Sequence, residues 1–169
     1  MNFNTGKPLE DPQCEAQSAI AYLRQGFDAQ AFLLLSGPQT EKDPAARFAL
    51  GLCHLRAGEQ DAAIFCFEQA LRLIKAIPGS GPGTTENGET YLTLAKKQIE
   101  DELYLKPMDG DFCARFPKFA EYMVLLALIS VYRQKGMGDQ AQKLAAGLTG
   151  PAFEAYKNKL REDISHGIS

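Results

Sequence analysis

A pattern of rings, glycines and an alanine in the middle of the chain constrains its fold more than any other feature. A glycine is followed by a ring, a second glycine, an alanine and a second ring: Gly51, His54, Gly58, Ala63 and Phe67. Two helices that cross closely need small residues at the crossing, and a glycine between them lets the chain reverse without a Cβ penalty. The pattern therefore predicts two antiparallel helices joined at Gly58, with Gly51 and Ala63 at their crossing.

Part of this pattern occurs three times. In each occurrence a ring stands four positions before a glycine, and an alanine stands five positions after it: Tyr22, Gly26 and Ala31; His54, Gly58 and Ala63; Tyr132, Gly136 and Ala141. The repetition predicts three hairpin units, at about residues 12–36, 43–76 and 117–148.

The central unit resembles the tetratricopeptide repeat. That family consists of helix–turn–helix units of about 34 residues whose signature has Leu-Gly, an aromatic residue, Ala and Phe at set intervals. Here Leu50-Gly51, Ala63 and Phe67 stand at those intervals, with His54 in the ring position. The resemblance implies an all-α fold of stacked antiparallel hairpins that binds other proteins. In such arrays the first helix of each pair lines a concave groove that holds a partner segment.

The resemblance also implies which residues line that groove. By the repeat register they form an apolar strip edged by two arginines, to which Ala16 adds a small residue: Ile20, Leu23, Arg24, Phe48, Leu52, Leu55 and Arg56. Family members that clamp C-terminal carboxylates use Lys and Asn in the groove, and the apolar residues here do not carry that function over. The strip suits an amphipathic helix or an extended apolar peptide, with acidic flanks near the arginines. Three covers stay open: a partner segment, a second copy of the chain, or another helix of the chain itself.

Local signals predict about eight helices and no strand, in a single domain. Asp11-Pro12 and Asp43-Pro44 each combine an N-cap acceptor with a proline at the first helical position. The apolar spacing then predicts helices over these ranges: 12–26, 28–35, 44–57, 60–77, 89–105, 117–135, 139–148 and 151–164. The last of these is highly charged and suits a capping helix.

Two segments between the helices have a different character. Pro78 to Gly88 contains almost no apolar residue and is predicted to be a mobile linker. Residues 107–116 are predicted to form a loop. The helix over 89–105 is one more than a regular array allows, so it is either an insertion or the partner of the helix over 117–135.

Composition excludes several classes of function. A net charge of −3 without a basic cluster does not favour nucleic acid or an anionic membrane. The N-terminus has no signal-peptide pattern, and the longest apolar run, Met123–Val131, is far shorter than the roughly 20 residues of a spanning helix. The four cysteines form no C-x-x-C pair, so we expect reduced thiols in the cytoplasm.

No catalytic or metal site is predicted. The second histidine, His166, is far from His54 in sequence, so a site with two imidazoles is not expected. Cys53 and His54 are neighbours on a helix and point in different directions. Asp109-Gly110-Asp111 lacks the remaining ligands of a calcium loop and reads as an acidic turn. Cys113, in the predicted loop, is expected to react faster with thiol reagents than Cys53 and Cys66.

The sequence thus favours a cytoplasmic, non-catalytic interaction scaffold that needs no cofactor and acts as an adaptor or small chaperone for another protein or a peptide segment. In size and in having three units, the chain is also similar to the small chaperones of bacterial secretion systems. The alternatives are a self-associating structural protein, for example a homodimer, and a helical ligand-binding domain or enzyme.

Overall fold

The regular structure in residues 12–78 and 89–165, which the computed structural model describes, is entirely helical. This confirms the predicted all-α fold. The α-helices are α1 (Pro12–Arg24), α2 (Asp28–Leu35), α3 (Pro44–Arg56), α4 (Gln60–Lys75), α5 (Glu89–Glu100), α6 (Gly110–Arg115), α7 (Pro117–Gln134), α8 (Gly138–Ala145) and α9 (Glu154–Ser165). Three 3₁₀ turns join them: η1 (Pro38–Thr40), η2 (Leu103–Leu105) and η3 (Pro151–Phe153).

The start of α3 follows from its capping residues. Asp43 Oδ1 accepts hydrogen bonds from the N–H groups of Ala45 at 2.8 Å and Ala46 at 3.2 Å. Pro44 occupies the first helical position, where a missing N–H costs nothing. The Asp-Pro pair thus fixes the helix start that the sequence predicts.

The three predicted hairpins share one turn geometry. Each glycine has a left-handed backbone, with φ of +83° at Gly26, +81° at Gly58 and +71° at Gly136. The residue after each glycine donates its N–H to the carbonyl of the ring residue, in the pairs Phe27–Tyr22, Glu59–His54 and Met137–Tyr132, at 2.8–2.9 Å. These bonds satisfy carbonyls that the end of a helix leaves without partners. The ring and glycine positions of the sequence pattern therefore mark three equivalent turns.

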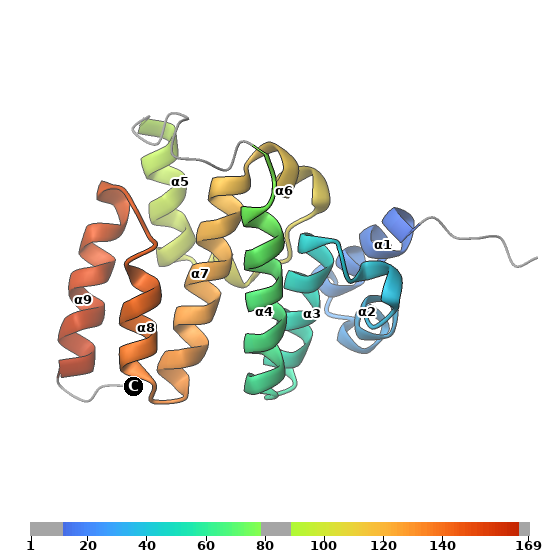
Figure 1. Cartoon of the computed structure of the whole chain (residues 1–169), viewed down its shortest axis with the longest axis horizontal. Coiled ribbons are helices and arrows are strands. Elements are labelled where there is room, and N and C mark those ends of the chain that lie inside the picture. The colour runs from blue at the N-terminus through green and yellow to red at the C-terminus, as the bar shows by residue number, and fades with distance from the viewer. Residues whose placement is uncertain (1–11, 79–88, 166–169) are drawn as a thin grey trace, which may run out of the picture.

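The hairpins α1/α2, α3/α4 and α7/α8 stack side by side (Figure 1). Both α1 and α2 pack on α3, α4 packs on α7, and α9 packs on α8 at the far end of the row. Within the central hairpin the rings of Phe48 and Phe67 lie 5.3 Å apart, centroid to centroid, and both are fully buried. The most deeply buried helix is α7, whose residues 120–129 are all buried.

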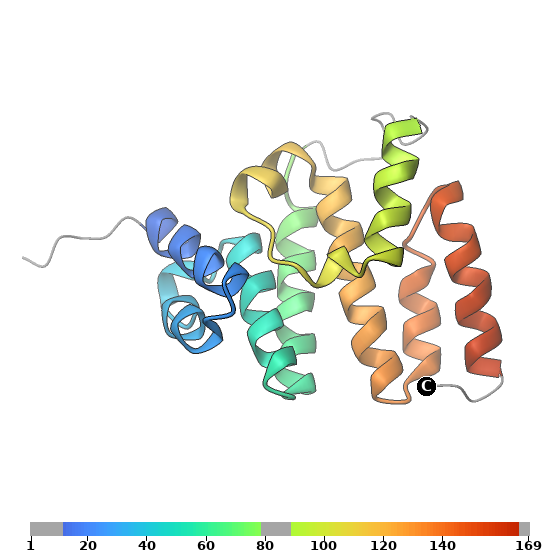
Figure 2. The same cartoon turned by 180° about the vertical axis from the view of Figure 1, so that it is seen from behind.

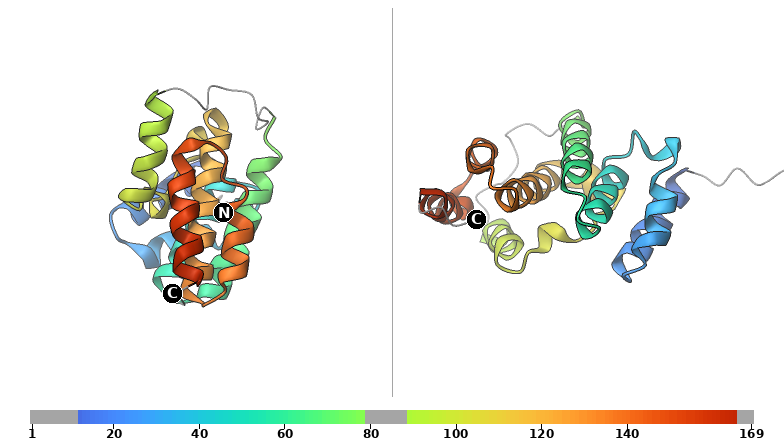
Figure 3. Two further views of the ribbon diagram at one scale, coloured as in Figure 1. Left: turned by 90° about the vertical axis from the view of Figure 1, so that its left-hand side faces the viewer. Right: turned by 90° about the horizontal axis from the view of Figure 1, so that it is seen from below.

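The extra helix is an insertion. Because α7 pairs with α8 and stacks directly on α4, the third hairpin follows the second without a helix between them. Helix α5 instead contacts η2 and η3. Figure 3 (right) shows α5 and η2 on the opposite side of α3 and α7 from α4 and α8.

The predictions for residues 89–116 need two corrections. The helix predicted over 89–105 ends at Glu100, because Glu102 adopts a left-handed backbone with φ of +50° and the chain turns to bury Tyr104 beside α7. The loop predicted over 107–116 contains α6, which begins where Asp109 Oδ1 accepts the N–H of Phe112 at 2.8 Å.

Smaller differences concern the ends of the chain and the linker. The described part has nine α-helices where about eight were predicted, and the capping helix over 151–164 starts as η3 before continuing as α9. Residues 79–88 of the predicted linker lie outside the described residues. Within residues 12–78 and 89–165, none of the helices is both long enough and apolar enough to cross a bilayer.

Candidate partner-binding cleft

A cleft of about 820 Å³ lies between α1 and α6, next to the N-terminus of α3 and the C-terminus of α4. This volume is within the range of binding sites in proteins. Apolar side chains from the four helices, and from just beyond the end of α4, line much of it: Ala16, Ile20, Pro44, Leu73, Ile77 and Ala114. Charged groups of both signs also line it: Arg24, Lys42, Asp43, Asp109 and Asp111.

Helix α1 forms one wall through residues one turn apart. Ala16 and Ile20 follow each other on one helix face, and both are 3% exposed. Arg24 follows one turn later and is exposed at the edge of the cleft. The wall is therefore apolar at Ala16 and Ile20, polar at Gln17, and carries a cation at one end.

Helix α6 forms the facing wall, and Asp109 orients it. One oxygen of Asp109, Oδ1, caps α6, while Oδ2 lies 3.4 Å from Nη2 of Arg24. The same Arg24 nitrogen donates to the carbonyl of Pro107 at 3.5 Å. A single aspartate thus both starts α6 and connects it to α1 across the cleft.

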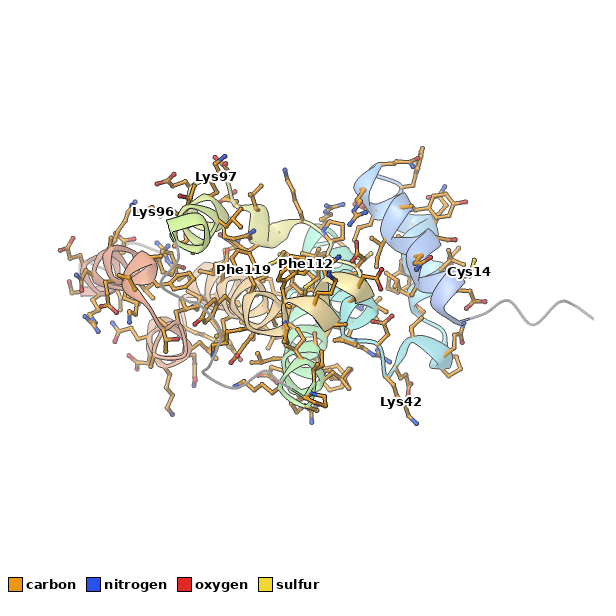
Figure 4. All side chains as sticks on the ribbon, turned by 90° about the horizontal axis from the view of Figure 1, so that it is seen from above. Cys14, Lys42, Lys96, Lys97, Phe112 and Phe119 are labelled. Atoms are coloured by element: carbon orange, nitrogen blue, oxygen red, sulfur yellow. The ribbon has the colours of Figure 1, made fainter. Side chains whose placement is uncertain are left out.

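Cys113 lines the cleft but is shielded from solvent. It is 1% exposed, and burial, with smaller contributions from Asp43 and Asp109, raises the pKa of its thiol to about 12. The prediction that Cys113 would be an accessible loop thiol is therefore wrong, because α6 turns it into the core. Cys14, on α1, is exposed (Figure 4).

The structure corrects the predicted groove for its apolar residues. Ile20, Leu23, Phe48 and Leu52 are each at most 3% exposed. They belong to the core that α1, α2 and α3 form together, and Leu55 is half-buried against it. Of the three covers left open by the sequence, the chain's own packing is the one observed for these side chains. Only Ala16, Ile20 and Arg24 of the predicted set line the cleft.

The two arginines predicted to hold acidic flanks of a partner are bound to aspartates of the chain itself. Arg56 Nη1 lies 2.7 Å from Asp28 Oδ1 and also donates to the carbonyl of Leu23 at 3.3 Å. Arg24 binds Asp109, as described above. Arg56 therefore joins α3 to the first hairpin, whereas Arg24 lies at the cleft.

The remaining cleft residues were not predicted. Leu73 comes from the last turn of α4 and Ile77 from just beyond it, and Asp109, Asp111 and Ala114 come from a segment interpreted as a loop. One local signal marks α6: Asp109 is a good N-cap residue, followed within one turn by Phe112 and Cys113. No local signal indicates that this segment would lie opposite α1.

His54 is held in place by a hydrogen bond and an aromatic contact within the protein. Its Nδ1 lies 2.6 Å from Glu59 Oε2, and its ring meets the edge of Phe32 at 5.4 Å between centroids. This confirms the prediction of a partly buried ring held by a hydrogen bond. Burial raises the pKa of the neighbouring Cys53 thiol to about 11, which disfavours its thiolate form. His166 lies outside the described residues.

In the described part of the chain, no group of three or more His, Cys, Asp or Glu side chains is arranged to hold a metal ion. The candidate site is thus a cleft with apolar walls and paired charges. Compared with known proteins, the chain matches no protein-family model, no curated protein and no solved structure.

Proposed function

We propose that this protein is a non-catalytic scaffold of the tetratricopeptide-like class, acting in the cytoplasm as an adaptor or small chaperone. It binds a helical or extended apolar segment of a partner protein in the cleft between α1 and α6. The observation that carries this proposal is the cleft itself, which has accessible apolar side chains at Leu73, Ile77 and Ala114 and charged side chains at its edge. Such a surface takes an amphipathic segment, whose apolar side chains enter while its polar side stays in water.

The position of the cleft supports the same function. It lies where the first hairpin meets the second, and residues from four helices contribute to it. Three of these helices, α1, α3 and α4, belong to the stacked hairpins, so their side of the cleft is preformed and a partner segment orders little of it when it binds. Preformed surfaces bind with a smaller entropic cost than surfaces that must first be ordered.

A substitution that fills the cleft tests the proposal. Ala114 lines the cleft and is exposed, so Ala114→Trp adds an indole there without entering the core. Ala155, exposed on α9 at the far end of the row, is the matched control as Ala155→Trp. Peptides selected from a random displayed library on the full chain are titrated against the three proteins by fluorescence anisotropy.

We expect Ala114→Trp to weaken binding of the selected peptides about tenfold or more, as loss of a contact at the centre of an interface does. Ala155→Trp leaves binding unchanged, and both variants keep the melting temperature of the wild type. Selected peptides that bind all three proteins equally, or a library that yields none, would contradict the proposal.

Self-association is the second candidate function, favoured by a different surface. The first hairpin, at one end of the row (Figure 1), exposes large apolar side chains: Tyr22 at 40%, Phe27 at 48% and Leu33 at 75%. The terminal units of helical repeat proteins usually present polar outer faces, as α9 does at the other end. If the chain dimerises here, sedimentation velocity detects a concentration-dependent mass that Leu33→Lys abolishes.

A further inference from the structure

One segment of the chain contacts the first helices of all three hairpins. It runs from η2 through α6, residues 103–116, and we call it the 103–116 segment. Its η2 part packs on α7, its α6 part packs on α3 and α7, and its middle is bound by Arg24 of α1. In Figure 2 it passes in front of α7, on the face of the row that carries α5. We call the side of α1, α3 and α7 that it contacts the first-helix face.

The 103–116 segment is held the way a bound peptide is held. Between η2 and α6 its backbone is extended, with φ and ψ of −96° and 142° at Lys106 and −102° and 169° at Asp109. Met108 is buried, at 3% exposed, and the carboxylate of Asp109 lies on Arg24. This extended stretch has two buried apolar residues, Pro107 and Met108, followed by one paired carboxylate, which is a recognition pattern built into the chain.

The contacts on either side of this stretch are weak. Glu102, just before the segment, has the left-handed backbone that side chains rarely adopt, so its conformation is strained. The Arg24–Asp109 ion pair is 3.4 Å long, and its side chains are 53% and 41% exposed. Exposed pairs of this kind contribute little to stability.

The far end of the segment is held by rings that also reach solvent. Phe112 contacts Phe116 and Phe119, with ring centroids at 5.6 Å and 6.1 Å, and Figure 4 shows Phe112 beside Phe119. Phe116 is 51% exposed. Between Lys106 and Phe116, Pro107, Met108 and Cys113 are buried, and the other residues are partly or fully exposed, so three side chains anchor this half.

We propose that the 103–116 segment is an internal ligand of the first-helix face, and that a partner segment displaces its α6 half. The partner is an extended peptide with an apolar side chain directly followed by Asp or Glu, whose carboxylate takes the place of Asp109 on Arg24. The proposal rests on the proposed function, because the displacing segment enters through the cleft beside α6. The resting protein is then partly self-occupied, and binding requires α6 to open.

Thiol labelling of the native full chain tests the opening. Cys113 reports on α6, whereas the buried Cys53 and Cys66 report on the α3/α4 hairpin and the exposed Cys14 gives the rate of an unprotected thiol. Each cysteine is followed by mass spectrometry in urea concentrations well below the unfolding transition. If α6 opens locally, we expect Cys113 to be labelled at a rate that does not depend on urea. Cys53 and Cys66 become accessible only through larger unfolding, so we expect their labelling rates to increase with urea.

Asp109→Asn is the decisive variant for this measurement. Asparagine caps a helix as well as aspartate does. The variant therefore removes the negative charge that pairs with Arg24 and keeps the start of α6. We expect Cys113 labelling to accelerate about two- to fivefold, the factor that an exposed ion pair supports. The matched control is Asp28→Asn, which breaks the Arg56–Asp28 pair and leaves Cys113 labelling unchanged. Labelling of Cys113 only in step with Cys66 overturns the proposal.

A peptide in trans tests the recognition pattern. The probe is a fluorescent peptide of residues 103–116 with Cys113→Ser, titrated against the full-length wild type and the full-length Asp109→Asn protein. We expect it to bind the variant about two- to fivefold more tightly, because the internal segment competes less well. The same peptide carrying Asp109→Asn is expected to bind both proteins more weakly than the Asp109 peptide, because it cannot pair with Arg24.

If the probe binds neither protein, the internal-ligand proposal is overturned. If Ala114→Trp nevertheless weakens the binding of the library peptides, the proposed function stands. Failure of the internal-ligand proposal is thus distinguishable from failure of the proposed function. Equal binding of the Asp and Asn probes to both proteins overturns the role assigned to Arg24.

Discussion

Gly51 lies directly beneath the ring of Phe67. A Cβ placed on Gly51 would be 2.5 Å from Cε1 and 2.6 Å from Cδ1 of that ring, which is fully buried. Neither α3 nor α4 has space to move away, because α3 also packs on the first hairpin and α4 on α7. The central hairpin therefore depends on the absence of a side chain at this one position.

We predict that Gly51→Ala destabilises the protein by about 1–3 kcal/mol through overpacking, and that Gly51→Leu has a larger effect. Gly110→Ala is the control, because a Cβ on Gly110 has no neighbour within 4 Å. Urea denaturation followed by circular dichroism gives the free energy of unfolding. A neutral Gly51→Ala variant would mean that the two helices separate without cost.

The three turn glycines predict a second set of effects. Gly26, Gly58 and Gly136 have open space around them but left-handed backbones, so alanine is strained there without a clash. We expect each Gly→Ala change to cost about 1 kcal/mol, and Gly58→Asn to cost less because asparagine tolerates this conformation better. Thermal and urea unfolding measure the loss. Clearly unequal costs at the three positions would contradict the equivalence of the turns.

The buried carboxylate of Glu121 gives a third prediction. Its side chain is 8% exposed, and its two oxygens lie 3.6 Å from Nζ of Lys75 on α4 and 3.0 Å from Nζ of Lys118 on α7. Lys118→Met leaves this carboxylate with the more distant lysine, and we expect a cost of about 1–3 kcal/mol in the free energy of unfolding. The exposed Lys143→Met is the control. If Lys118→Met and Lys143→Met cost the same, the buried carboxylate does not depend on Lys118.

The buried thiols predict a loss of stability in alkaline solution. Burial raises the pKa of Cys113 from 9.0 to about 12 and that of Cys53 to about 11, so the folded chain holds these protons more tightly than the unfolded chain. Their contribution is complete below pH 9 and is lost as the pH rises toward 11–12. We expect urea midpoints to fall across this range, and to fall less for Cys113→Ser than for the wild type. An equal fall in both proteins would show that Cys113 does not contribute.

Features that depend on neighbours within a few residues were predictable from the sequence. Asp43 caps α3 through N–H groups two and three positions away, and the turn at Gly58 is closed by a bond from Glu59 to His54. The same local logic predicts the hairpins at Gly26 and Gly136. Even the close crossing was predictable, because only glycine leaves room at Gly51 for a ring on the facing helix.

The candidate site was only partly predictable, because it is made by residues far apart in the sequence. Arg24 was predicted to lie at the edge of a partner-binding surface, and it does lie at the cleft, but its partner Asp109 is 85 positions away. Phe48 and Leu52 were predicted to be open to a partner, and they are core residues instead. An apolar helix face has the same sequence pattern whether it packs against another protein or against another part of its own chain.

The sequence by itself thus determined the helices, the three equivalent turns and the small residue at the central crossing, since each depends on the backbone preferences and capping bonds of nearby residues. Only the tertiary structure decided that the 103–116 segment lies across α1, α3 and α7, and that Glu102 ends α5 early. The reason is energetic: burying Tyr104, Met108 and Cys113 on that face outweighs the local preference for a longer helix and an open loop. The sequence pattern of a single segment does not specify which apolar surface of the protein that segment will pack against.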